Sequence, residues 1–161
     1  MIKRRVTGYR RALWLSIGIL SFLAACAGDP DEPSGPRVPL PDTAPQLPSA
    51  TLIIPDGVKL SEQRVGAEAR LYSFTLRGRP LFGLYLGPNP TFNPPADAPE
   101  VQREIVDGQP AKTVVSQQGD AWSRDMLVPS RHGVFYHFFY HDLSGSDLLT
   151  ADDIIASLQE R

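Results

Sequence analysis

Short apolar runs, each ended by turn residues, follow one another through the chain after Ala50. In the run at residues 69–77 apolar and polar residues alternate, so that one face carries Arg70, Tyr72, Phe74 and Leu76. This alternation is typical of strands with one buried face, and tight turns join such strands as antiparallel neighbours. The pattern therefore predicts an antiparallel β-sheet for most of the chain.

The predicted strands are residues 51–54, 69–77, 81–86, 101–106, 111–117, 121–128 and 133–141. Asp107-Gly108 lies between two of them and is the strongest hairpin signal in the chain. A C-terminal helix is predicted to begin at Thr150, with Asp152 and Asp153 in its first turn and an apolar stripe of Ile154, Ile155 and Leu158. We therefore expect one α+β domain at residues 50–161, a sheet of about six or seven strands with this helix packed on one face.

The segment before this domain has the charge pattern of an export signal. Residues 1–11 carry five basic residues and no acid, and residues 12–25 are almost wholly apolar. A basic start, a short apolar run and small residues at its end define a secretory signal peptide. The apolar run is shorter than the roughly 20 residues that a membrane-spanning helix needs. Residues 1–25 are therefore predicted to be a signal peptide.

The end of this run, Leu23-Ala24-Ala25-Cys26, resembles the lipobox of bacterial lipoproteins. The resemblance implies cleavage before Cys26, a diacylglycerol thioether on its sulfur and acylation of its amino group by a fatty acid such as palmitate. Several acyl chains on one residue give stable anchoring. Ala27 beside the anchor favours the outer membrane, with the domain facing the periplasm. Cleavage after Ala27, which would release a soluble secreted protein, is the alternative.

Residues 26–49 are predicted to be a flexible linker because residues 29–48 contain seven prolines. Loss of residues 1–25 leaves 11 basic against 18 acidic residues, a net charge of −7. Such an acidic chain is a poor candidate for binding nucleic acid. Cys26 is the only cysteine, so the domain that follows has neither disulfides nor thiolate metal ligands.

His137 and His141 are candidate ligands for a metal ion. Within a strand, four residues separate them by about 13 Å, which is too far for one ion with ligand bonds of about 2.1 Å. The chain also lacks a nucleophile motif such as G-x-S-x-G. The sequence therefore predicts neither a catalytic residue nor a metal or other cofactor, and His137 is expected to have a structural role.

These features favour a non-catalytic binding or assembly module of the cell envelope over a periplasmic hydrolase or a metal-dependent enzyme. Its expected partners are the membrane, through Cys26, and another envelope protein or a small apolar ligand. The candidate binding surface comprises Phe92, in a proline-rich loop at residues 87–99, with Tyr136 and Tyr140 of the aromatic strand. The alternative for that strand is burial on both faces at the centre of the sheet.

The hairpin at residues 106–111 (VDGQPA) and the ending at residues 154–158 (IIASL) resemble Mog1/PsbP-type α+β domains. This resemblance carries no catalytic motif. It implies a protein-binding or assembly role, in agreement with the classes favoured above.

Overall fold

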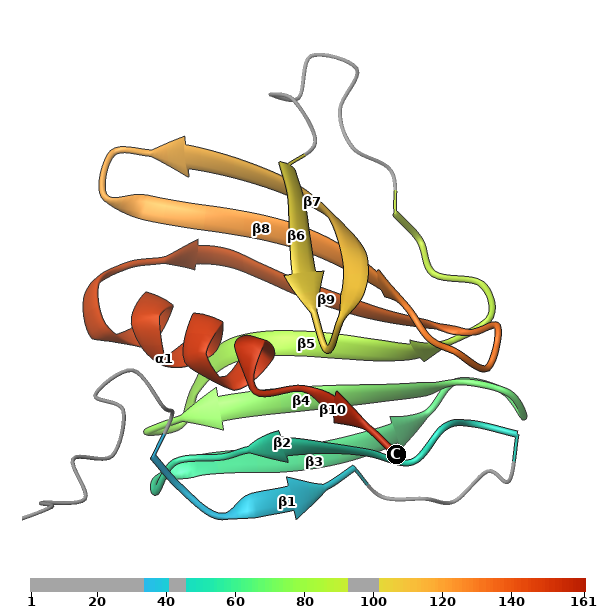
Figure 1. Cartoon of the computed structure of the whole chain (residues 1–161). Coiled ribbons are helices and arrows are strands. Elements are labelled where there is room, and N and C mark those ends of the chain that lie inside the picture. The colour runs from blue at the N-terminus through green and yellow to red at the C-terminus, as the bar shows by residue number, and fades with distance from the viewer. Residues whose placement is uncertain (1–33, 41–45, 93–101) are drawn as a thin grey trace, which may run out of the picture. The chain divides into compact units, whose positions relative to one another are not determined.

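The computed structural model describes residues 34–40, 46–92 and 102–161, and these residues are mostly β-strand. A large antiparallel sheet has the strand order β3-β4-β5-β9-β8-β7-β6 (Figure 1). Its strands are β3 (Val58–Arg64), β4 (Arg70–Leu76), β5 (Arg79–Gly87), β6 (Gln102–Val106), β7 (Gln109–Gln118), β8 (Ala121–Pro129) and β9 (Phe135–Leu143). A smaller sheet, β1-β2-β10, consists of β1 (Arg37–Pro39), β2 (Ala50–Ile53) and β10 (Gln159–Glu160). The helix α1 (Gly145–Ala156) lies between β9 and β10 in the chain.

Tight turns connect neighbouring strands where the sequence predicts them. Asp107 and Gly108, with φ of 49° and 73°, join β6 to β7, and Val106 pairs with Gln109. Positive φ at both central residues is the geometry of a type I′ hairpin turn, which Asp-Gly favours. The predicted hairpin is therefore confirmed.

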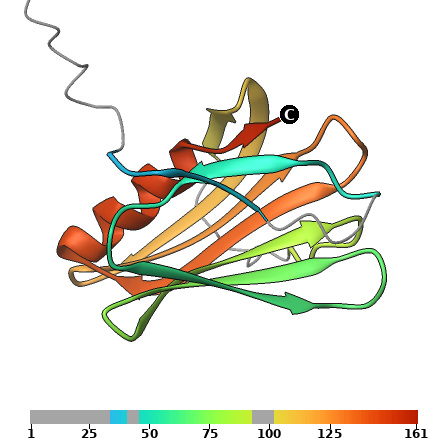
Figure 2. The same cartoon turned by 90° about the horizontal axis from the view of Figure 1, so that it is seen from below.

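The buried face of the large sheet is built from the alternate residues of β4, β5 and β9. Its aromatic and aliphatic side chains are Tyr72, Phe74, Phe82, Leu84, Leu86, Tyr136, Phe138 and Tyr140. The rings of Phe74 and Phe82 stack with their centroids 4.1 Å apart. α1 and the small sheet lie against this face (Figure 2) and contribute Leu52, Ile154 and Ile155 to the same core. The face predicted for residues 70, 72, 74 and 76 is thus confirmed, with Leu76 only partly buried against the core. Helix packing on one face of the sheet is also confirmed, but the α+β prediction of one sheet is wrong in that β1, β2 and β10 form a second sheet.

The helix begins earlier than predicted. Ser144, in extended conformation, precedes its first residue, and Asp147 lies in its first turn. Thr150, the predicted cap, is inside the helix and donates a hydrogen bond from its hydroxyl to the carbonyl of Ser146 at 2.8 Å. The predicted start is therefore wrong. Ser144-Gly145-Ser146 has the composition of a turn, so the sequence did not indicate that a helix begins there. Within the described residues no helix is both long enough and apolar enough to cross a membrane.

Part of the predicted linker belongs to the fold. β1 pairs with β2 along Arg37↔Ile53 to Pro39↔Thr51, and Leu40 and Leu47 are buried. Proline is tolerated in β1 because an edge strand has one side without ladder hydrogen bonds. The prediction of a flexible linker reaching residue 49 is therefore wrong for these residues. The predicted signal peptide and the lipobox, including Cys26, lie outside the described residues.

Two acidic residues connect α1 to the large sheet. The Asp152 carboxylate accepts hydrogen bonds from the Arg124 guanidinium at 2.8 Å and from the Tyr140 hydroxyl at 3.2 Å. Asp147 pairs with Arg79 at 2.6 Å, but the Arg79 side chain is 67% exposed. The Arg124 side chain is 13% exposed and that of Asp152 is 38% exposed, so this pair is half-buried. Asp152 is the stronger of the two connections because it accepts from two donors and its cation is the more buried.

We predict that Asp152→Ala lowers the free energy of unfolding by about 1.5–3 kcal/mol, since Arg124 and Tyr140 both lose an acceptor. Arg79→Gln, which removes the exposed pair at the same helix, should cost at most about 1 kcal/mol. Urea denaturation of the two variants measures the difference. Equal losses would show that Asp152 does not fasten the helix in this way.

Candidate functional site

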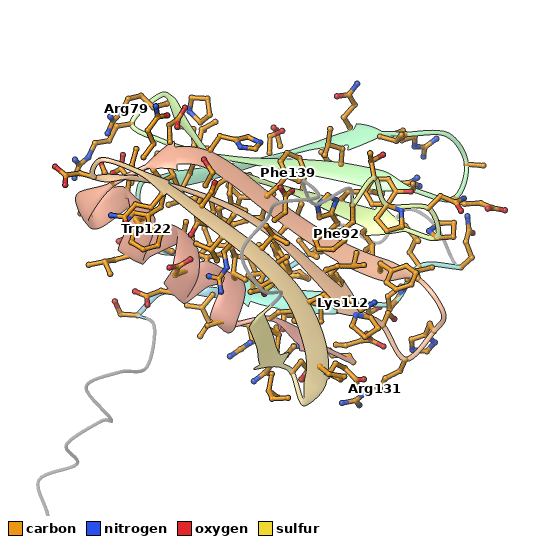
Figure 3. The ribbon with its side chains drawn as sticks, turned by 90° about the horizontal axis from the view of Figure 1, so that it is seen from above. Arg79, Phe92, Lys112, Trp122, Arg131 and Phe139 are labelled. Carbon is orange, nitrogen blue, oxygen red and sulfur yellow. The ribbon has the colours of Figure 1, made fainter. Side chains whose placement is uncertain are left out.

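The face of the large sheet opposite the core carries a second group of aromatic side chains. Leu84 and Leu86 of β5 point into the core, so Gly83, Tyr85 and Gly87 point the other way. Strand register sets Gly83 beside Phe139 and Tyr85 beside His137. Figure 3 shows Phe92 and Phe139 away from α1, whereas Trp122 is partly buried against the core. We call the face that carries Tyr85, His137 and Phe139 the outer face of the sheet.

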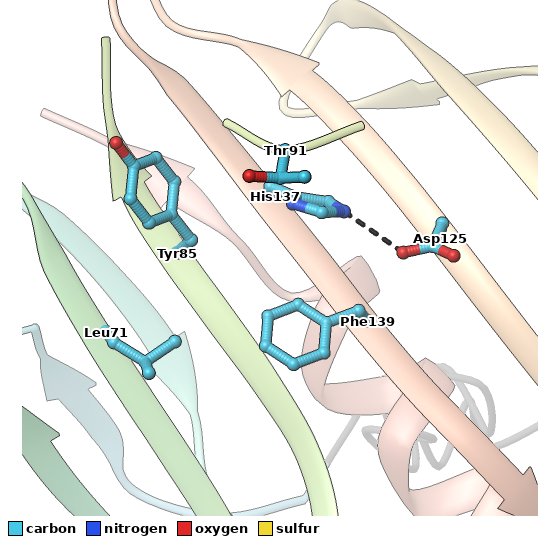
Figure 4. A pocket seen from close by; sticks show the side chains of 6 residues that line it. All are labelled: Leu71, Tyr85, Thr91, Asp125, His137 and Phe139. Atoms are coloured by element: carbon cyan, nitrogen blue, oxygen red, sulfur yellow. Dashed lines mark hydrogen bonds and ion pairs between the residues drawn. The ribbon is translucent and has the colours of Figure 1, made fainter. Parts of the chain in front are cut away.

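Two glycines let aromatic rings lie over the backbone of β5. A methyl group at Gly83 would overlap the end of the Phe139 ring, and one at Gly87 would lie 2.7 Å from the Tyr85 hydroxyl oxygen. Both glycines are therefore required for close approach rather than for an unusual backbone angle. In a view onto the outer face, the rings of Tyr85 and Phe139 are nearly face-on (Figure 4). Their π-faces are thus turned away from the sheet.

These rings form part of a groove of about 350 Å³. Its lining residues are Leu71, Tyr85, Thr91, Asp125, His137 and Phe139. They come from β4, β5, β8, β9 and the segment that follows β5, so strands far apart in the sequence meet here. The volume is at the lower end of the range for small-molecule sites, about 300–1,000 Å³.

A histidine–aspartate pair forms the polar part of the groove. His137 Nε2 lies 3.1 Å from Asp125 Oδ1, and the exposed fractions of the two side chains are 7% and 43%. An ionised carboxylate only accepts hydrogen bonds, so the nitrogen that faces it carries the proton. Phe92 meets the imidazole edge-on at 5.9 Å, and Phe139 packs beside it at 5.4 Å. The imidazole is therefore held by a carboxylate and by two rings.

The structure divides the predicted binding residues between two faces. Phe92 lies at the groove, against His137. Tyr136 and Tyr140 are 1% and 4% exposed and belong to the core face, so the prediction that they lie on a binding surface is wrong. β9 is apolar on both faces, and the sequence pattern does not tell which face the helix covers.

Their surroundings keep both tyrosine hydroxyls neutral. Burial raises the pKa of Tyr140 to about 12, and the charge of Asp152 adds to this effect. Burial also raises the pKa of Tyr136 far above its ordinary value, with a further contribution from Glu160. Both residues thus serve the core as neutral groups.

Most residues that line the groove had no role in the sequence-based hypothesis, among them Tyr85 and Asp125. Spacing offers a signal for the first, because in Gly83-Leu84-Tyr85-Leu86-Gly87 a tyrosine stands between two glycines of one strand face. Asp125 is found only from the register, which pairs it with Phe139. His137 and His141 both lie in β9, as predicted, and His141 is exposed. In the described part of the chain no three or more His, Cys, Asp or Glu residues come together as metal ligands.

Comparisons of the chain with protein-family models, with curated proteins and with solved structures gave no match. The chemical groups of the groove are therefore the evidence on function. Its rings offer flat apolar surfaces, Asp125 offers a charged acceptor, and Thr91 and Tyr85 offer hydroxyl groups. This combination suits reversible binding of a small group with apolar and polar parts.

We predict that Gly83→Ala displaces the Phe139 ring and lowers the free energy of unfolding by about 1–3 kcal/mol, as overpacking does. In the double variant Gly83→Ala/Phe139→Ala the loss should be smaller than the sum of the single losses, by about 0.5–3 kcal/mol. Urea denaturation of the four proteins in the cycle measures this coupling.

The control for this cycle pairs Ser116→Ala with Phe139→Ala. Ser116 is an exposed residue of β7, so its substitution should change stability by less than about 0.5 kcal/mol. Strict additivity of Gly83→Ala and Phe139→Ala would contradict the close approach of this ring to β5.

Proposed function

We propose that this chain is a lipid-anchored protein of the bacterial envelope whose domain is a non-catalytic binding module. The groove on the outer face is its binding site. The observation that carries this proposal is the presence of two ring faces, Tyr85 and Phe139, beside the His137–Asp125 pair. Burial in the core would stabilise the fold, and these rings give up part of that stabilisation by lying at the surface. Apolar groups gathered at a surface are typical of ligand sites.

The anchor in this proposal is a lipid on Cys26. Support comes from the basic residues 1–11, the apolar residues 12–25 and the order Leu23-Ala24-Ala25-Cys26. The proposed location is the outer membrane, with the domain facing the periplasm. Its proposed partners are another envelope protein or a small ligand that enters the groove.

A hydrolase is the second candidate, and the groove supplies one observation in its favour. A histidine oriented by an aspartate is the base of nucleophilic hydrolases, and Thr91 lines the same groove. Thr91 would then have to donate a hydrogen bond to the imidazole, and the hydrogen bond that the structure gives this ring goes to Asp125. The binding module needs no such additional contact and is the better supported function.

The anchor is tested by labelling. Cells that express the wild-type chain and are fed radiolabelled palmitate should yield a labelled, processed protein in the membrane fraction. Cys26→Ser should abolish both the label and the membrane association, because the thioether requires the sulfur. Ser34→Ala, beyond the signal, is the control and should label normally. A labelled Cys26→Ser protein would refute the anchor.

The groove is tested by site-specific photocrosslinking in cells, with the Cys26 anchor intact. p-Benzoylphenylalanine at Thr91, in the groove, should give a defined adduct on illumination. The same group at Gln118, exposed at the far end of β7, should give none. Intact-mass measurement distinguishes a small-molecule adduct from a protein adduct. An adduct of equal yield at both positions, or none at Thr91, would refute the groove as the binding site.

A further inference from the structure

We propose that the groove selects a small organic cation, an ammonium group carried on an apolar body. This inference rests on the proposed function, since it names the ligand class of the same site. Its basis is the combination of one carboxylate, Asp125, with the half-buried rings of Tyr85 and Phe139 in a groove of about 350 Å³.

The carboxylate determines the sign of the ligand charge. Asp125 has a side chain that is 43% exposed, so a ligand in the groove can reach it. Its described partner, His137, forms one hydrogen bond with Oδ1 at 3.1 Å, which uses one of the several acceptor positions of the carboxylate. An anionic ligand would be repelled here, whereas an ammonium group would gain an ion pair.

The rings favour a cation over a neutral polar group. Phe139 is the register partner of Asp125 on one side and of Gly83 on the other; its ring extends over Gly83, and both Phe139 and Asp125 line the groove. The face of an aromatic ring is the negative part of its quadrupole and attracts a cation within about 6 Å of the centroid. A ligand that contacts Phe139 and Asp125 together would therefore receive both attractions at one charged centre.

The net charge of the chain agrees with this preference, whereas Lys112 opposes it. Lys112 shares the row of His137 on the outer face, but Leu127 stands between them in the strand register. After loss of residues 1–25 the chain has a net charge of −7, which attracts cations over longer distances. Leu71 and the aromatic rings leave an apolar surface for the body of the ligand.

Three probes of similar size isolate the effect of charge. Benzylamine is a cation at neutral pH, benzyl alcohol is neutral and benzoate is an anion. Titrations of the domain followed by NMR amide shifts should show saturable shifts at β5, β8 and β9. We expect benzylamine to bind about fivefold tighter than benzyl alcohol, and benzoate to bind most weakly.

Two variants test the sources of the preference. Asp125→Asn should lower the affinity for benzylamine about fivefold and leave the affinity for benzyl alcohol unchanged. Phe139→Leu keeps an apolar side chain but removes the ring face. It should therefore reduce the ratio of the benzylamine affinity to the benzyl alcohol affinity. Asp120→Asn, in the exposed turn between β7 and β8, is the matched control and should change neither affinity.

The outcomes separate this inference from the proposed function. If all three probes bind equally, or if Asp125→Asn leaves benzylamine binding unchanged, the cation preference is overturned while the groove stands as a binding site. If no probe shifts the amide signals of the groove strands but the Thr91 crosslink forms, the cation preference is likewise overturned and the proposed binding module stands. If the Thr91 crosslink also fails, both are overturned.

Discussion

Packing of α1 and the small sheet against one face of the seven-stranded sheet is the interaction on which the rest of this structure depends. It buries the alternate residues of β4, β5 and β9, including Tyr72, Phe138 and Tyr140. β9 is apolar on both faces, so burial of one face leaves Phe139 and His137 on the other. The groove thus follows from a strand that has more apolar surface than one covering layer can bury.

Most strands of the large sheet were predictable because their patterns are local, but β3 was not predicted, since its residues are mostly polar and exposed. Alternation and turn residues located β4, β5 and β8 to within a few residues, and Asp107-Gly108 located a hairpin. The start of α1 was not predictable from composition, since Ser144-Gly145-Ser146 is equally compatible with a turn. β1 was missed because its prolines suggest a linker, and only pairing with β2 shows otherwise.

The site was less predictable than the fold because it depends on register between distant strands. Asp125 and His137 are joined across β8 and β9, and neither belongs to a sequence motif. Tyr136 and Tyr140 have the composition of a binding surface but lie in the core, because the sequence does not specify the covered face. The spacing of Gly83, Tyr85 and Gly87 is the one local sign of the groove.

The small sheet also affects when the chain can finish folding. β2 pairs with β1 on one side and with β10 on the other, through Gln159↔Thr51 and Glu160↔Ala50, and the Arg161 amide donates to the Ser49 carbonyl at 2.8 Å. Because synthesis runs from the amino end, this sheet cannot close until residues 159–161 have been made. In the exported protein proposed above, late closure of this sheet would keep the chain unfolded for longer and so competent for translocation.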